Sequence, residues 1–195
     1  MNDLDLVNAA LRLVGENRIE TLDNTVNSAL ISTANEFLPR VKAACLRAHD
    51  WNCARRRRAL VAVTNDSLEE WAYAYRVPVD CLAVRRFVGS DDFTRGASFA
   101  VELGNDDESI LYCNVVDAKI VYTAEFTNVG GWDSLLYDAC SARLALEFAA
   151  TFAREIRWIE AMWKLWIQKT DEAVGVNSSE GGDERLYSNA LAEVR

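Results

Sequence analysis

The stretch Trp71-Ala72-Tyr73-Ala74-Tyr75-Arg76 decides the fold class. Aromatic side chains alternate here with small or polar ones, and this period of two residues is typical of a β-strand with one aromatic face. Similar short runs, separated by polar or glycine-containing turns, span residues 59–64, 82–88, 98–103, 110–115 and 119–123. Because no segment of helical length lies between these runs, we expect an antiparallel sheet whose strands are joined by hairpins.

The segment before the strands predicts two helices. Apolar residues of the first recur at helical spacing, namely Leu4, Val7, Leu11 and Val14. Asn2 or Asp3 fits its N-cap, and Gly15 fits the left-handed position after its end. A second helical pattern runs from about residue 25 to 50. Pro39 lies inside it, removes a backbone donor and predicts a kink or short break near Leu38.

Helical periodicity returns after Gly130-Gly131, where Asp133 or Ser134 fits an N-cap. It continues to about residue 174, which is long for one helix. Two interpretations stay open: an antiparallel pair divided near residues 153–157, or one long helix. Residues 175–182 have the composition of a linker and lead to a short amphipathic segment at 183–195.

These patterns predict an α+β protein. Both chain ends, residues 1–54 and 132–174, form a discontinuous antiparallel helical bundle. Residues 55–131 form an inserted antiparallel β lobe, and residues 175–195 form a C-terminal tail.

Composition excludes several classes of protein. Half of the 195 residues are hydrophobic, which indicates a globular core, and the net charge of -9 disfavours broad binding to DNA or to an anionic membrane. The five scattered cysteines include no CxxC pair, so neither a disulfide framework nor a zinc site is expected. No secretory leader or membrane span is expected either. We expect the protein in a reducing cytosol or in a particle assembled there.

Residues suited to catalysis are scarce, and no catalytic site, cofactor or metal is expected. His49 is the single histidine and lies where the second helix ends, so a capping role is favoured over a catalytic triad. Acidic groups at 69–70, 91–92 and 106–108 fall in expected turns, where solvated carboxylates are ordinary.

Ten residues are candidates for contact with a partner. The basic block Arg55, Arg56, Arg57 and Arg58 either pairs with acids of its own chain or binds an acidic partner or a neighbouring subunit. Three aromatic residues, Trp158, Trp163 and Trp166, fall within nine positions and cannot all share one narrow helical stripe, so one of them is expected at a subunit interface. In the tail, the apolar residues Leu186, Tyr187 and Leu191 need a surface to dock against.

Several motifs, in order, resemble tail tubular protein A, the head-to-tail adaptor family of podoviruses. They include Asn8-Ala9-Ala10-Leu11, then Trp51-Asn52 with the arginine block, and an alanine-rich helix at 142–149. The most specific is Trp71-Ala72-Tyr73-Ala74-Tyr75-Arg76-Val77-Pro78-Val79-Asp80-Cys81-Leu82. The resemblance covers most of the chain, but it departs from the family at Cys53, at Pro39 and in the aromatic segment 155–166.

The resemblance implies a structural virion protein made in the host cytoplasm. It implies a ring of about twelve subunits below the portal protein, holding the tail nozzle protein around a channel through which genomic DNA passes without specific binding. An acidic channel wall suits such passage, because like charges repel within ~8–10 Å. Two alternatives are a tail-associated hydrolase of polysaccharide or peptidoglycan, and a nucleic-acid-binding module.

Overall fold

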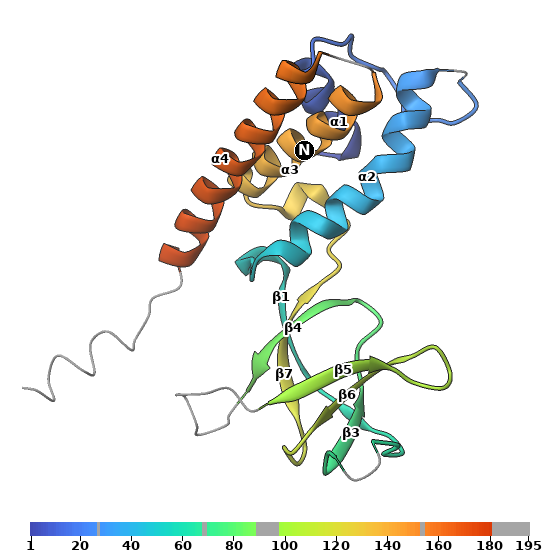
Figure 1. Cartoon of the computed structure of the whole chain (residues 1–195), viewed down its shortest axis with the longest axis vertical. Coiled ribbons are helices and arrows are strands. Elements are labelled where there is room, and N and C mark those ends of the chain that lie inside the picture. The colour runs from blue at the N-terminus through green and yellow to red at the C-terminus, as the bar shows by residue number, and fades with distance from the viewer. Residues whose placement is uncertain (27, 68–69, 89–97, 153–154, 181–195) are drawn as a thin grey trace, which may run out of the picture. The chain divides into compact units, whose positions relative to one another are not determined.

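The structure is a computed structural model that describes residues 1–26, 28–67, 70–88, 98–152 and 155–180 (Figure 1). It is an α+β fold whose described residues contain four α-helices and two antiparallel sheets. The chain divides into two compact units. The helical unit comprises Met1–Phe37 and the chain from Asp133 onward, and the sheet unit is Leu38–Trp132.

Helix α1 (Asp3–Leu13) begins and ends as expected. The Asn2 side chain accepts a hydrogen bond from the Asp5 backbone at 2.9 Å, and the Asp5 carboxylate accepts one from the Asn2 backbone at 3.0 Å. This reciprocal pair is a capping box. After the helix, Gly15 adopts a φ of +73°, the left-handed conformation that glycine accepts without strain.

Helix α2 (Ala29–Ala48) is continuous, so of the two outcomes expected near Pro39, a kink or a short break, the break is wrong. Leu38 and Val41 lie on either side of the proline and are almost fully buried. Burial of these turns offsets the loss of one backbone hydrogen bond. The boundary between the two compact units lies within this helix, between Phe37 and Leu38, whereas the sequence placed it at residue 54.

Two helices follow the sheet unit, which answers the question left open by the sequence. Helix α3 (Ser134–Thr151) is capped by the Asp133 side chain, and helix α4 (Ile156–Glu180) runs antiparallel to it. The direction follows from two contacts. Lys169 lies 3.5 Å from Asp138, and the guanidinium of Arg143 lies 4.5 Å from the ring centre of Trp166.

Helix α4 includes most of the segment that has a linker-like composition. It continues through Gly175 to Glu180, so the linker expected from residue 175 is wrong over this range. Ala173 is buried in the turn before it, and an established helix extends at little cost per residue.

The strands form two sheets rather than one. The first has the order β1 (Arg55–Ala59), β7 (Lys119–Ala124) and β4 (Cys81–Phe87). The second has the order β2 (Val61–Ala62), β3 (Tyr73–Arg76), β6 (Ser109–Cys113) and β5 (Phe99–Leu103). Strand β7 pairs with β1 and β4, which are distant in sequence, so hairpins alone do not build the lobe.

One core cluster joins the two sheets. It includes Tyr75 and Leu111 from the second sheet and Ile120 and Tyr122 from the first. Trp71 does not share this face, which corrects the expected single aromatic face. It packs instead with Ala74, Ile110 and Tyr112 on the other side of the second sheet. The strand begins only at Tyr73, and Trp71 belongs to the preceding turn, where its backbone N–H donates to the Ser67 hydroxyl at 3.2 Å.

Candidate functional site

The arginine block is itself the edge strand β1 of the first sheet. Its register sets Arg55 and Arg57 opposite Thr123 and Val121. Arg56 and Arg58 lie opposite Tyr122 and Ile120. Because neighbouring residues of a strand point to opposite faces, the four arginines divide into two pairs with different surroundings.

Asp80 joins Arg56 to the core residue Tyr122. Its carboxylate accepts from Arg56 Nη1 at 2.8 Å and from the Tyr122 hydroxyl at 3.2 Å. The Arg58 side chain also lies near the Tyr122 hydroxyl. Burial, together with the Asp80 charge and hydrogen bond, raises the pKa of Tyr122. Asp80 thus ties the turn before β4 to strands β1 and β7.

Arg55 and Arg85 also make contacts within the chain, on the face of the sheet opposite to Arg56. Arg55 pairs with Asp50 at 3.0 Å. Arg85 lies at an irregularity of β4, where the register against β7 shifts, and this bulge directs its guanidinium towards the end of α2. There it donates to the carbonyls of Arg47 at 2.8 Å and His49 at 2.6 Å, and to the Thr123 hydroxyl at 2.8 Å.

His49 does not take the expected capping role, because the Arg85 guanidinium donates to the last carbonyls of α2. The imidazole packs edge-on against Trp51 with a centroid distance of 4.9 Å. Burial is the main cause that lowers the His49 pKa; Arg85 and Arg55 lower it further, and Asp50 opposes them.

Arg57 is exposed and lies on the same face of β1 as Arg55. Val121 stands between it and Arg86, since both arginines are in register with that residue from opposite sides. Within the described ranges, no hydrogen bond or ion pair involves the guanidinium of Arg57 or Arg86. These two exposed cations are available to an acidic partner, whereas Arg55 and Arg56 pair with acids of their own chain.

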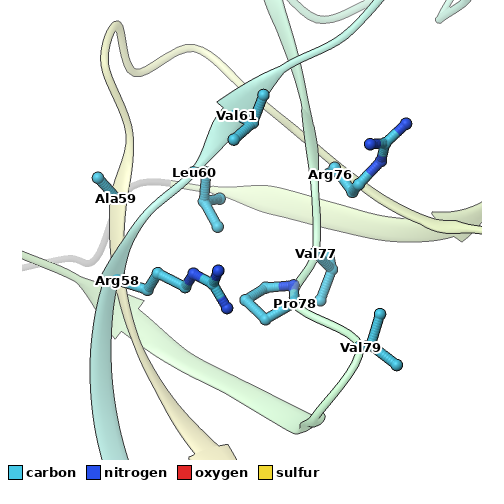
Figure 2. Close-up of a pocket in the computed structure, with 8 residues that line it drawn as sticks. All are labelled: Arg58, Ala59, Leu60, Val61, Arg76, Val77, Pro78 and Val79. Atoms are coloured by element: carbon cyan, nitrogen blue, oxygen red, sulfur yellow. The ribbon is translucent and has the colours of Figure 1, made fainter.

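A groove lies at the corner where the chain passes from β1 to β2 (Figure 2). Its volume is about 150 Å³, and we call it the corner groove. The guanidinium of Arg58 extends towards Pro78 inside it, whereas Val61 and Val79 project at its rim. Val61 is 66% exposed and Val79 is fully exposed. The lining residues are Arg58, Ala59, Leu60, Val61, Arg76, Val77, Pro78 and Val79.

A second, polar pocket of about 420 Å³ gathers carboxylates of the sheet unit. Asp66, Asp106 and Glu108 line it, with Tyr112 among the other lining residues. Glu108 pairs with Arg76 at 2.6 Å, and Asp66 accepts from Asn105 at 3.4 Å. Of the acidic groups noted in the sequence, only 106–108 contributes to this pocket; Glu69, Asp91 and Asp92 lie outside the described residues.

Helix α4 exposes an unusual number of large apolar side chains. Only Met162 and Ala173 of its 25 residues are buried. Trp166 packs under Arg143, but Trp158 is 43% and Trp163 48% exposed. Ile156 and Ile167, which were not among the predicted contact residues, are 75% and 41% exposed. The helical periodicity of these residues is visible in the sequence. The side of the helix that packs against α3 is not.

The tail candidates Leu186, Tyr187 and Leu191 lie outside the described residues. Among the residues that the structure describes, no three His, Cys, Asp or Glu side chains gather at a point that could hold a metal ion. None of the helices in that part of the chain is long and apolar enough to cross a membrane. Cys81 is half-buried, and desolvation followed by the Asp80 charge raises its pKa to about 11, so its thiol is protonated at neutral pH.

No model of a known protein family matches the chain, and no curated protein is detectably similar to it. The surfaces described above therefore carry the functional argument together with the motif resemblance.

Proposed function

We propose that this chain is a structural virion protein of a short-tailed phage, a head-to-tail adaptor that assembles as a ring of about twelve copies between the portal and the tail nozzle. In this proposal both chain ends form one antiparallel helical bundle with the β lobe inserted in it. Genomic DNA passes through the ring without being held.

The exposed apolar face of α4 is the observation that carries the proposal. Ile156, Trp163 and Ile167 follow one another at i, i+7 and i+11, which aligns them along one side of a helix. Large apolar patches on a protein surface mark sites of association, and tryptophan is enriched in them. A protein whose role is assembly needs such a face on each copy.

The motifs shared with the adaptor family have a clear structural use. Asp80, from the Val77-Pro78-Val79-Asp80 turn, binds the arginine block through Arg56 and the core through Tyr122. Two separate parts of the resemblance thus meet in one network. The helical unit also carries an excess of acidic residues, with 14 Asp and Glu against 7 Lys and Arg in residues 1–37 and 133–180, which suits a surface that repels DNA.

Electron microscopy of the full chain mixed with its portal protein tests this function. We expect rings attached to the portal, with the nozzle protein binding only when the chain is present. If the chain forms no ring and leaves the portal bare at every concentration and salt, the adaptor function is rejected.

A glycan hydrolase remains the second candidate, and the polar pocket is the observation that favours it. Two carboxylates across a cleft are the basic requirement of glycoside hydrolysis, and Asp66, Asp106 and Glu108 line one pocket. Polysaccharide and peptidoglycan assays of Asp66→Asn, Asp106→Asn and Glu108→Gln test it. Activity that all three substitutions leave unchanged would come from a contaminant.

A further inference from the structure

The corner groove combines an apolar rim with an exposed cation, Arg58. Val61 and Val79 present exposed methyl groups, and Arg58 extends its guanidinium towards Pro78 in the groove (Figure 2). A void near 150 Å³ holds a group about the size of benzene, which is also the scale of one branched aliphatic side chain. The groove therefore suits an apolar side chain with a carboxylate close to it.

Helix α4 presents this combination of groups. Ile156, Glu160, Trp163 and Ile167 lie at i, i+4, i+7 and i+11, so the carboxylate of Glu160 stands within the apolar stripe. All four side chains are exposed. In the described part of the chain, Glu160 makes no hydrogen bond or ion pair. Helix α3 covers a different side of α4, the one with Met162, Trp166 and Ala173.

We propose that the stripe Ile156, Glu160, Trp163 and Ile167 of one copy docks in the corner groove of a second copy. The stripe supplies isoleucine and tryptophan side chains to the valine rim, and Glu160 supplies the carboxylate for Arg58. This inference rests on the proposed ring function and names the two surfaces that meet in it. Apolar and charge complementarity both select the second copy as the occupant.

The two surfaces differ, and this determines the kind of assembly. A contact between two unlike patches is heterologous, and each copy keeps one free patch after binding. Such a contact propagates from copy to copy and closes into a ring when the rotation between neighbours allows it. A stripe that paired with the same stripe of another copy would stop at a dimer.

Two full-length variants separate the surfaces. The groove variant carries Val61→Glu and Val79→Glu, and the helix variant carries Ile156→Glu and Ile167→Glu. All four positions are exposed, so both proteins should fold. The matched controls make the same charge change elsewhere, with Val101→Glu and Leu103→Glu on β5 and Gln168→Glu and Ser178→Glu on α4.

Sedimentation velocity over a concentration series gives the readout. The wild type and both controls should form higher oligomers. Each variant alone should remain monomeric at concentrations roughly tenfold above the wild-type transition, because every contact lacks one of its two surfaces. When the two variants are mixed, one intact groove meets one intact stripe, so a one-to-one dimer should form and grow no further.

The contact is overturned if the groove variant assembles like the wild type, if the mixture gives no dimer, or if the wild type itself stays monomeric. Failure of the adaptor function gives other results. If the wild type forms oligomers and the mixed variants form a dimer, but none of them binds the portal, the contact is supported and the adaptor function is rejected. If both variants form normal rings on the portal, the adaptor function is supported and the contact is rejected.

Discussion

The hydroxyl of Tyr122, on the central strand β7, donates a hydrogen bond to the carboxylate of Asp80 at 3.2 Å. Tyr122 is almost completely buried, and Asp80 also accepts from Arg56. Because Asp80 precedes β4 and Arg56 lies on β1, this small network links all three strands of the first sheet. Its stability should therefore depend on the ionisation of the phenol.

Tyr122→Phe should destabilise the protein by about 1 kcal/mol at pH 7, because one partly buried hydrogen bond is lost. The pKa of Tyr122 is raised in the folded protein, so its contribution is complete below the ordinary value of 10.0 and is lost as the pH rises further. Urea unfolding from pH 7 to 11 should show a smaller alkaline loss in the variant. The exposed Tyr73 provides the control Tyr73→Phe, and an equal effect of both substitutions would contradict the role of the network.

Arg56→Ala and Arg57→Ala should affect different properties. Arg56 binds Asp80, and its loss should cost about 0.5–1 kcal/mol in urea unfolding, since the pair is partly exposed. Arg57 is exposed, so its removal should change unfolding by less than about 0.5 kcal/mol. It should instead reduce the salt dependence of assembly. Identical unfolding curves for the two variants would indicate that the whole arginine block is a solvated edge strand, with no separate structural and binding members.

His49 should make the protein less stable in acid. Its folded pKa lies below the ordinary 6.5, chiefly because of burial, so the unfolded chain binds the proton more readily. The stability is thus complete above about pH 6.5 and decreases as the pH falls below it. His49→Gln should flatten the dependence of the unfolding free energy on pH between about 5 and 7. A slope that is unchanged would place the acid sensitivity in other groups.

The same substitution at two glycines should have opposite effects. Gly15 has a φ of +73°, and Gly15→Ala should destabilise by about 1 kcal/mol although the site is open. Gly175 lies within α4, also in open space, and Gly175→Ala should stabilise the helix by up to about 1 kcal/mol. Thermal melts of the two variants provide the comparison. A stabilising effect at Gly15 would contradict the left-handed turn.

Truncation after Glu180 should leave the melting temperature within a few degrees of the full chain, because the last buried residue of α4 is Ala173. Portal attachment should weaken if the segment 181–195 binds the portal, as the proposed function suggests. Truncation after Gln168 is the control, since it removes Ala173 and the contact of Lys169 with Asp138 and should lower the melting temperature. If truncation after Glu180 unfolds the protein, the segment 181–195 is required for folding, and the expected outcome is wrong.

Local signals in the sequence predicted the elements well. The caps at Asn2 and Asp133 and the turn glycine at Gly15 need only neighbouring residues for their stability. The division between α3 and α4 was left open by the sequence, because it depends on how the two helices pack. Errors arose where distant contacts override local preference. Burial around Pro39 keeps α2 continuous, and a buried alanine ahead of Gly175 extends α4 through a composition typical of linkers.

The proposed contact surfaces were also predictable only in part. Residue types and their spacing were enough to predict the chemistry: an acidic α+β chain with one basic block, few residues suited to catalysis, and a tryptophan-rich helix near its end. The tertiary structure decided which of these groups remain free for a partner. Strand pairing committed Arg56 to Asp80 and left Arg57 exposed, and helix packing turned Trp166 towards α3 but left Trp163 in solvent. Exposure depends on which face a distant element covers, and no local pattern contains that information.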